Sequence, residues 1–570
     1  MTSVDMRHEQ MFPTLEISQI EVAIRFASSS ERTFGPGETI YEVGESAAAT
    51  WLVLAGTIEA VRRDGLGRLS ASVTLGPGQL TGEVGQLAGR VSLVGGKAGA
   101  NGCVGVPFDA AHLRALVIGS AEIGEVIMRA LILRRVGLIE SGTSGAVLVG
   151  HTGTPDLVRL QGFLSRNGYP YTLLEADDHQ EGQALIARLG VNLDELPLMV
   201  CPDGRVLKCP TNATAGLCIG LTPKLDPETI YDVAVVGAGP AGLATAVYAA
   251  SEGLPVIVID QRAIGGQAGA SSRIENYLGF PTGISGQALA GRAVNQAQKF
   301  GAVLAVPLEA SRLICDSTSG TDRLQLEIVD GEPVRARAIV IASGVHYRRA
   351  AIAHLETLEG AGVSYWASPI EANLCAGEEI ALVGGGNSAG QAVAYLAPQV
   401  KRLHLIVRGK NLEASMSRYL IDRIAALPNV EFHTRTEVVG VEGDRSRGLN
   451  AAVFRHRDSG IERRCPMRHL FLFIGADPHT SWLDGCVALD NKGFVLTGQP
   501  SSNLTRTTSL LETSLPGVFA VGDVRAGSTK RVAAAVGEGA AVVAQIHALL
   551  GGTEPTASSV AAVLLPAVRG

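Results

Sequence analysis

The sequence predicts a multidomain α/β protein in which a β-barrel domain and a small α/β domain precede two dinucleotide-binding domains. Three observations support this fold class. The chain has 570 residues, too many for one hydrophobic core. Glycine is abundant at 69 residues while charged residues make up 18%, as in domains with apolar parallel strands and tight turns. Two glycine-rich turns, at 237–242 and 384–389, each follow an apolar strand.

Composition and charge exclude several function classes. The net charge is −7 and no Lys/Arg run is present, so we expect no nucleic-acid partner. The N-terminus has no apolar signal segment and no run of 18 uncharged apolar residues suggests a membrane span, so we expect a soluble, cytoplasmic protein. Eight cysteines without a CxxC pair argue against a disulfide scaffold and a zinc ribbon.

Residues 1–145 are predicted to form a β-barrel or jelly roll followed by helices, because short apolar runs alternate with Gly-containing turns. The order F-x-x-G-E-x-I-x-x-x-G-E, then GEVGQLAG, resembles a cyclic-nucleotide-binding domain. Gly82 and Glu83 match the turn that meets the ribose in that family, but Ser92 stands where its phosphate-binding Arg is expected. Arg90 or Lys97 could replace that Arg only in a rearranged loop. A buried phosphate without a cation is costly, which favours a structural or dimerising role over live nucleotide sensing.

Residues 146–225 are predicted to fold as a second small α/β domain with the order βαβαββα, including a helix closed by Gly190. This order resembles the thioredoxin/glutaredoxin fold, and Pro197 lies where that fold carries a cis-proline. The loop GHTGTPD, where the redox CxxC would follow the first strand, has no Cys. Folding the hairpin about Asp203-Gly204 puts Cys201 opposite Val206 and not Cys209. We therefore interpret the cysteines of this region as small core residues; they are Cys201, Cys209 and Cys218.

The first dinucleotide unit is YDVAVVGAGPAGLATAVYAASEGLPVIVID, a strand, a G-x-G-x-x-G turn, a helix and a strand ending in Asp260. Gly237 permits the tight turn, Gly239 lets backbone approach a pyrophosphate, and Gly242 lets helix pack on strand. The pyrophosphate would lie on the helix N-terminus. Asp260 can accept hydrogen bonds from the adenosine ribose.

The second unit, EIALVGGGNSAGQAVAYLAPQVKRLHLIVRG, repeats the pattern with Gly384, Gly386 and Ala389. Its second strand ends in Arg408 rather than in an acid. A guanidinium can bind the 2′-phosphate of NADP that an acid would repel, so the sequence favours NADPH over NADH. Lys410 and Arg418 could add charge. The alternative is that Arg408 is a solvated surface residue.

Residues 231 to about 548 resemble the bacterial, low-molecular-weight thioredoxin reductases in the segments GAGPAG, GGQ, ENYLGFP, ASG, GGGNSA, FIGADP and VGD. The resemblance implies an FAD-binding domain built from residues 228–345 and 470–550, an inserted NAD(P)H-binding domain at 346–469, and a tail at 551–570. It also implies a homodimer. The fold class is thus two Rossmann-like FAD/NAD(P)-binding domains behind a cyclic-nucleotide-binding-like and a thioredoxin-like domain.

The resemblance also implies the cofactor contacts. The residues expected at FAD are Gly237, Gly239, Pro240, Ala241, Gly242, Asp260, Gly266, Gln267, Asn276, Gly344, Gly522, Asp523 and Val532. Those expected at NADPH are Gly384, Gly386, Asn387, Ser388, Ala389, Arg408 and Lys410. Gly409 stands at the second position of the family's two-arginine phosphate motif, so that motif is half present.

The segment before the second glycine turn departs from that family. Where the family has Cys-Ala-Thr-Cys, this chain reads Trp366-Ala367-Ser368-Pro369. Cys375 is unpaired and cannot cycle as an intramolecular disulfide, so we expect a small buried residue. Trp366 could pack in the core or cover the flavin face.

The sequence therefore predicts an FAD-containing oxidoreductase without a redox-active cysteine pair. NADPH would give hydride to flavin N5, and an unidentified acceptor would take the electrons. Without the CxxC, the chain also resembles the ferredoxin(flavodoxin)–NADP reductases that are built on the same scaffold. We therefore expect a small redox protein, a quinone or oxygen as the electron acceptor. Two alternatives stay open: a thioredoxin-disulfide reductase, as the fold alone suggests, or a flavin or nucleotide redox sensor with little turnover.

Overall fold

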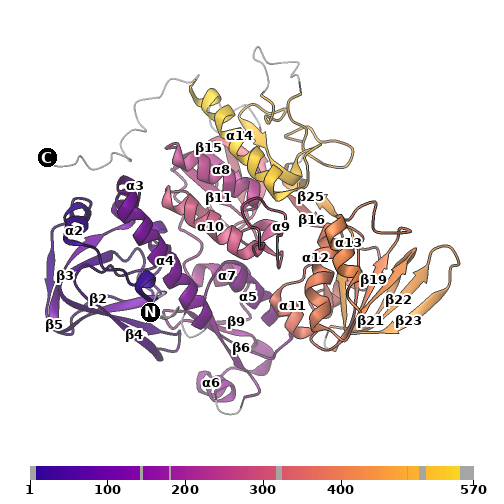
Figure 1. Ribbon diagram of the computed structural model, residues 1–570, viewed down its shortest axis with the longest axis horizontal. Helices are drawn as coiled ribbons and strands as arrows, with labels where there is room; N and C mark the ends of the chain where they lie inside the picture. Colours follow the sequence, from indigo (N-terminus) through magenta and orange to yellow (C-terminus); the bar gives the residue numbers. More distant parts are fainter. Residues whose placement is uncertain are drawn as a thin grey trace.

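The computed structural model describes residues 8–141, 145–178, 181–315, 324–445, 447–483, 485–499 and 509–551. Four units follow one another along the chain (Figure 1). A β-rich N-terminal unit lies at one end, and the second dinucleotide unit lies at the other. The first dinucleotide unit and the small α/β unit lie between them. The C-terminal helix returns to the first dinucleotide unit.

The β-rich unit confirms the predicted β content of the N-terminal region as one antiparallel sheet with strand order β1-β5-β3-β4, in which β2 also pairs with β5. Its apolar core includes Phe34, Leu52 and Phe108, which are almost fully buried. The strands are β1 (Arg32–Phe34), β2 (Thr39–Tyr41), β3 (Thr50–Arg63), β4 (Leu69–Leu75) and β5 (Val94–Phe108), and the helices are α2 (Ile17–Ile24), α3 (Ala110–Gly119) and α4 (Ala121–Ser141).

The small α/β unit has the predicted βαβαββα order. Its sheet runs β7-β6-β8-β9, with β6 and β7 parallel and the other pairs antiparallel. Gly190 closes α6 in the left-handed region at φ +62°, and the Leu196–Pro197 bond is cis, as the sequence predicts. The elements are β6 (Ala146–Gly150), α5 (Pro155–Arg166), β7 (Tyr171–Glu175), α6 (Gly182–Leu189), β8 (Leu198–Val200), β9 (Val206–Lys208) and α7 (Asn212–Cys218).

The cysteines of this unit correct the sequence prediction. Cys201 and Cys218 form a disulfide bond, and Cys209 is exposed rather than part of the core. The hairpin pairs Val200 with Val206, one residue from the predicted register. The prediction failed because α7 folds back over the hairpin and brings a cysteine 17 residues away into contact, which turn geometry alone does not reveal.

A second disulfide, Cys315–Cys486, joins the end of β13 to a loop 171 residues later. The sequence argues against a disulfide-rich scaffold, which two bonds do not contradict, but it predicts neither of these two bonds. The spacing of the cysteines in the sequence carries no signal for either bond, since both depend on tertiary packing.

The first dinucleotide unit is built on a seven-stranded sheet of order β12-β11-β10-β15-β14-β13, with β26 also paired to β15. Its strands are β10 (Ile230–Val236), β11 (Val256–Ile259), β12 (Val303–Ala305), β13 (Ala310–Ile314), β14 (Leu324–Ile328), β15 (Val334–Ile341) and β26 (Val518–Ala520). Its helices are α8 (Pro240–Ser251), α9 (Gly266–Gly269), α10 (Gly286–Lys299) and α14 (Val532–Gly551).

The second dinucleotide unit is inserted between β15 and β26. Its five-stranded parallel sheet runs β17-β24-β18-β19-β20, and a three-stranded antiparallel sheet, β21-β22-β23, packs beside it. The strands are β17 (Val363–Ser364), β18 (Glu379–Val383), β19 (Arg402–Val407), β20 (Val430–Thr434), β21 (Thr436–Asp444), β22 (Gly448–His456), β23 (Glu462–Pro466) and β24 (His469–Leu472), and the helices are α11 (Pro369–Leu374), α12 (Asn387–Leu396) and α13 (Arg418–Ala425). The pair β16 (Val345–Tyr347) and β25 (Ala476–Pro478) joins the two units.

Helix α14 is long and apolar enough to cross a membrane by length and composition, and no other helix of the described segments is. It packs along α8, where a Cβ on Gly539 would lie 2.2 Å from the carbonyl oxygen of Ala241. Its residues Val542, Val543 and Ile546 are buried in the core of the first dinucleotide unit. We therefore interpret α14 as a helix that packs one apolar face against the first dinucleotide unit.

The Gly82–Glu83 turn of the β-rich unit is closed by its own side chains. The Glu83 carboxylate accepts a hydrogen bond from the Gly85 amide at 2.9 Å and lies 3.5 Å from Arg135. Arg134 donates to the carbonyl oxygens of Leu80 and Gly82 at 2.8 and 3.0 Å. The cavity beside this turn is about 40 Å³, whereas small-molecule sites are typically about 300–1,000 Å³.

We expect no binding of cyclic AMP or cyclic GMP by the full-length protein in calorimetry at micromolar nucleotide. Glu83 is already bonded to the Gly85 amide and near Arg135, and Arg134 is bonded to backbone carbonyl oxygens. Ser92 donates to the Val94 carbonyl oxygen at 2.7 Å instead of supplying a cation. A Ser92→Arg variant should also fail to bind, because the cavity beside the turn remains too small for a nucleotide. Saturable micromolar binding by the wild type would contradict this reading.

Candidate functional site

A cavity of about 2740 Å³ lies where the small α/β unit and the two dinucleotide units meet. Its lining comes from α5 and the preceding loop, from both glycine turns, and from the segment before α11. Its volume is well above the about 300–1,000 Å³ of ordinary ligand sites, so it has room for more than one nucleotide.

The first glycine turn connects β10 to α8 at the edge of this cavity. Gly237 has φ +116°, and a Cβ there would lie 2.2 Å from the carbonyl oxygen of Ala342. A Cβ on Gly242 would lie 1.9 Å from the Gly237 carbonyl oxygen. At Gly239, by contrast, a Cβ would meet only one atom, 4.0 Å away. The outer two glycines therefore serve packing within the protein, and the middle one leaves open space toward the cavity.

The N-terminus of α8 is suited to an anion. Gly239 is its N-cap and provides no side-chain cap, so the first amide groups of the helix are not satisfied by a capping side chain. Gly239, Pro240 and Ala241 all line the cavity. Free amides and the helix dipole together favour a phosphate at this place.

Asp260 follows β11 and ties the turn in place. One carboxylate oxygen accepts from the Ala238 amide at 2.9 Å, and the other accepts from the amides of Arg262 and Ala263 at 2.8 and 3.1 Å. Each carboxylate oxygen has two lone pairs, so acceptor capacity remains for a ribose hydroxyl on the cavity side.

The remaining residues predicted for FAD lie around the same cavity. All members of that set line it except Gly242 and Gly522, which lie behind the lining. Gln267 donates to the Val345 carbonyl oxygen at 2.7 Å, which fixes its side chain next to Gly266. Asn276 and Gly344 complete the wall on this side.

Asp523 lies between β26 and α14, and it lines the same cavity. Burial raises the pKa of Asp523 above its ordinary value, although the nearby Lys530 charge lowers it. The Lys530 ammonium donates to the Asp523 backbone carbonyl. Because the carboxylate is largely buried, its ionised form is poorly solvated, and a hydroxyl donor such as a ribityl group would stabilise it. These features fit FAD.

Only part of the second glycine turn lines the cavity. Gly384 has φ +153°, and a Cβ there would lie 2.6 Å from the Phe473 carbonyl oxygen. Asn387 and Ser388 line the cavity, whereas Gly384, Gly386 and Ala389 lie behind them. Gly386 is the N-cap of α12 without a side-chain cap, so this helix also offers free amides to an anion.

Arg408 and Lys410 follow β19 and are exposed. They do not line the cavity, and neither forms an ion pair with any residue that the structure describes. Arg418, the third candidate, is already paired with Asp422 at 2.9 Å within α13. Arg408 and Lys410 are therefore available to an anionic ligand, and Arg418 is engaged.

The segment Trp366–Pro369 forms a helix cap instead of a thiol pair. Ser368 caps α11 and donates to Glu371, and the Ser368 amide donates to the same carboxylate at 3.0 Å. The Trp366 indole N–H donates to Glu371 at 2.9 Å, so the ring is half-buried in a fixed position on the cavity wall. The sequence left open whether Trp366 is a core or a cavity residue, and the structure places it at the boundary.

Cys375 is fully buried, as the sequence predicts, and does not line the cavity. Burial raises the pKa of its thiol to about 11. A thiol in this state is a poor nucleophile at neutral pH.

Arg166, at the end of α5 in the small α/β unit, is a cavity residue that sequence reasoning missed. It donates to the Gly266 carbonyl oxygen at 2.9 Å, and its Nε atom is buried without a hydrogen-bond partner among the described residues. Burial lowers the pKa of Arg166, while the charge of Asp260 raises it. In the sequence, a basic residue in the last turn of a helix is ordinary, so no local pattern marks this one.

Two further contacts fix the small α/β unit against the loop after β11 and against α10 of the first dinucleotide unit. The Asn167 side chain accepts from the Ile264 amide at 3.2 Å. Gln287 of α10 donates to the Ser165 carbonyl oxygen. The same helix α5 also contacts α11 of the second dinucleotide unit. The small α/β unit therefore forms one wall of the cavity.

Comparison with known proteins agrees with this geometry. The pyridine nucleotide-disulphide oxidoreductase family matches residues 231–539. The sequence is 32% identical over 317 residues to NADPH-dependent thioredoxin reductase 3 of Arabidopsis thaliana, covering 55% of this chain and 57% of that protein. It is 31% identical to thioredoxin reductase of Listeria monocytogenes, covering 55% of this chain and 91% of that protein.

Solved structures give the same result for this part of the chain. The crystal structure of T. acidophilum thioredoxin reductase matches with a TM-score of 0.50 and 27% identity, over 56% of this chain and 99% of that one. Lactococcus lactis thioredoxin reductase matches with a TM-score of 0.51 at 24% identity, over 57% and 100%, and shows the fold alone.

We expect Arg166→Ala and Asp523→Ala each to weaken FAD retention by about 10–100-fold, because a hydrogen bond to a charged group contributes about 1.5–3 kcal/mol. The readout is the ratio of flavin to protein after gel filtration, together with fluorescence titration of the FAD-stripped protein. Arg188→Ala, which changes an exposed residue on α6 of the small α/β unit, should retain FAD like the wild type. Undiminished FAD affinity in Arg166→Ala would remove this residue from the site.

Proposed function

Because the chain belongs to the pyridine nucleotide-disulphide oxidoreductase family, in its thioredoxin reductase class, we propose that it is an FAD-dependent NADPH oxidoreductase that works without a cysteine pair. The observation that carries the proposal is the cavity. Both glycine turns contribute to it, and no cysteine is among its lining residues in the described part of the chain.

The residues of the first turn hold FAD in this proposal. The amides at the start of α8 and the guanidinium of Arg166 bind its pyrophosphate, Asp260 binds the adenosine ribose, and Asp523 binds the ribityl chain. NADPH lies on the second turn, with Asn387 and Ser388 facing the cavity and Arg408 on the 2′-phosphate. When bound, FAD supplies the acceptance of hydride from nicotinamide and the release of electrons.

The chain's own residues orient the cofactors and exclude water. Trp366 is held by Glu371 on the wall between the two turns, where its apolar ring shields the space in which the cofactors meet. The thioredoxin reductase class, by the resemblance described above, passes electrons through two cysteines at positions 366 and 369. This chain has no sulfur there, so we propose that electrons leave from the flavin directly to a quinone, oxygen or a small redox protein.

A second candidate function is a redox sensor in which cofactor occupancy is read by the appended units. The contacts of Arg166 and Asn167 with Gly266 and Ile264 in the loop after β11 favour it, since they connect the small α/β unit to the proposed FAD site. Steady-state NADPH oxidation with ferricyanide separates the two functions. Sustained turnover supports the enzyme, whereas a single stoichiometric bleaching of the flavin supports the sensor.

NADPH should reduce the flavin at lower concentration than NADH. Arg408→Ala should reduce that preference by about 10–100-fold, because it weakens the binding of NADPH and leaves the binding of NADH unchanged. Anaerobic titrations followed by flavin absorbance provide the measurement. Arg463→Ala, an exposed arginine on β23 of the same unit, should leave the preference unchanged. If the wild type responds equally to both nucleotides, Arg408 does not read the phosphate.

The wild type should not reduce thioredoxin in an NADPH-dependent insulin assay, whereas it should reduce ferricyanide or a quinone. Dithiol exchange needs two thiols in reach of each other, one to attack and one to resolve. The Cys201–Cys218 disulfide is buried in the core and does not border the cavity.

The same assay tests the small α/β unit as an internal electron carrier. If the wild type reduces thioredoxin and Cys201→Ser or Cys218→Ser abolishes this activity, the proposal of direct electron release is wrong. Cys315→Ser, which opens the other disulfide, is the matched control for a general loss of stability.

A further inference from the structure

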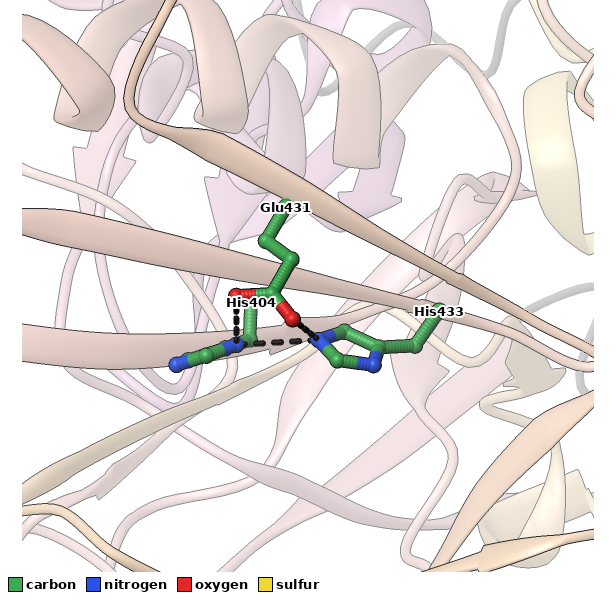
Figure 2. A group of neighbouring side chains, drawn as sticks. All are labelled: His404, Glu431 and His433. Carbon is green, nitrogen blue, oxygen red and sulfur yellow. Dashed lines mark hydrogen bonds and ion pairs between the residues drawn. The ribbon is translucent and has the colours of Figure 1, made fainter.

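Three side chains that commonly bind metals converge on the sheet of the second dinucleotide unit, away from the cavity. His404 on β19 is the register partner of Glu431 on the parallel strand β20, and His433 lies two residues further along β20. Figure 2 shows the two imidazole rings and the carboxylate pointing toward one another. None of the three lines the cofactor cavity.

The distances between their donor atoms match a metal coordination shell. His404 Nδ1 lies 2.9 Å from His433 Nε2 and 3.6 Å from the nearer oxygen of Glu431, and His433 Nε2 lies 3.4 Å from the other oxygen. Ligand atoms at about 2.0–2.1 Å from a tetrahedral zinc ion are about 3.3 Å apart. The observed separations scatter around that value, so an ion could enter with small side-chain movements.

A fourth residue orients the buried histidine. His404 is 2% exposed, and its other ring nitrogen, Nε2, lies 2.8 Å from the carboxylate of Glu379 on β18. When Nε2 carries the proton donated to Glu379, the lone pair of Nδ1 faces His433 and Glu431. A carboxylate on the distal nitrogen of a ligating histidine is the usual support of a protein zinc site.

The surroundings leave one side of the cluster open. The Phe454 ring covers it with its centroid 6.1 Å from the His404 ring and 5.8 Å from the His433 ring. The side chain of Glu431 is 44% exposed and that of His433 is 17% exposed, which gives an ion a route from solvent. Arg402 lies 3.8 Å from one oxygen of Glu431 and competes for that oxygen only.

We propose that His404, Glu431 and His433 bind one divalent zinc-type ion, with the fourth position taken by water or an external ligand. Two imidazoles and one carboxylate suit zinc better than magnesium or calcium, which prefer oxygen ligands. The ion would link β19 to β20, and β19 leads directly to Arg408. This proposal does not depend on the proposed function.

The test uses full-length, tag-free protein treated with a chelator and then titrated with zinc chloride in a calorimeter. We expect one ion per chain with micromolar or tighter affinity. Replacement by Co²⁺ should give the visible absorption of a tetrahedral site at wavelengths beyond the flavin bands. Melting temperature should rise with zinc, because an ion that binds the folded state alone stabilises it.

Variants separate this site from other zinc-binding groups. His433→Ala and the isosteric Glu431→Gln should abolish stoichiometric binding, and Glu379→Ala should weaken it by about 10–100-fold. His151→Ala is the matched control, because His151, Glu175 and Asp177 form the other potential cluster in the described segments. Cys209→Ser controls for the exposed thiol. Both controls should bind like the wild type.

Flavin content and circular dichroism show whether each variant is folded. If His433→Ala does not fold, Glu431→Gln alone decides the outcome. Absence of saturable zinc binding to the wild type would overturn the proposal, and the two imidazoles would then share a proton in a simple hydrogen bond. Binding that survives in Glu431→Gln but is lost in His151→Ala would overturn it as well.

Discussion

The close approach of the first glycine turn to the end of β15 is the constraint on which the arrangement of the cofactor site depends. Gly237 lies so near the Ala342 carbonyl oxygen that no side chain fits. This contact sets α8 directly behind the turn, and Asp260 holds the turn from the other side through the Ala238 amide. The start of α8, which no side chain caps, therefore lies at the cavity. Strand β26 joins the sheet beside β15, and helix α14, which follows it, can then pass along α8 at the glycine contact near Ala241.

The small α/β unit gives this site a wall that the dinucleotide units alone do not have. Its helix α5 ends against the loop after β11, where Arg166 and Asn167 contact Gly266 and Ile264, 100 and 97 residues later in sequence. An arginine whose Nε is buried and unpartnered is costly unless an anion completes its hydrogen bonds. In the proposed function the Arg166 guanidinium would bind the FAD pyrophosphate as well as the Gly266 carbonyl oxygen, which would couple docking of the unit to occupancy of the nucleotide site. That coupling is compatible with either an enzyme or a sensor, and turnover distinguishes them.

Hydrogen bonds fix the conformation of the segment before α11, and residues 366–369 contain no cysteine. Glu371 accepts from the Trp366 indole and from the Ser368 amide, so the segment forms the start of a helix with its aromatic ring fixed. A flexible dithiol loop would need to move between the flavin and an external partner, whereas this cap resists movement. The two disulfides of the chain, Cys201–Cys218 and Cys315–Cys486, do not border the cavity.

The sequence by itself determined the features that depend on neighbours along the chain. The glycine spacing, the acid 23 residues after Gly237, the helix closed by Gly190 and the cis-proline at Pro197 are local, because turns and helix ends are specified within a few residues. The loss of the cysteine pair is likewise visible in the sequence. Only the tertiary structure decided which cysteines pair, that Arg166 reaches Gly266 in the loop after β11, and that His404 meets His433 across two parallel strands. These contacts join residues 17 to 171 positions apart, and their partners are set by packing and strand register, for which a single sequence carries no local signal.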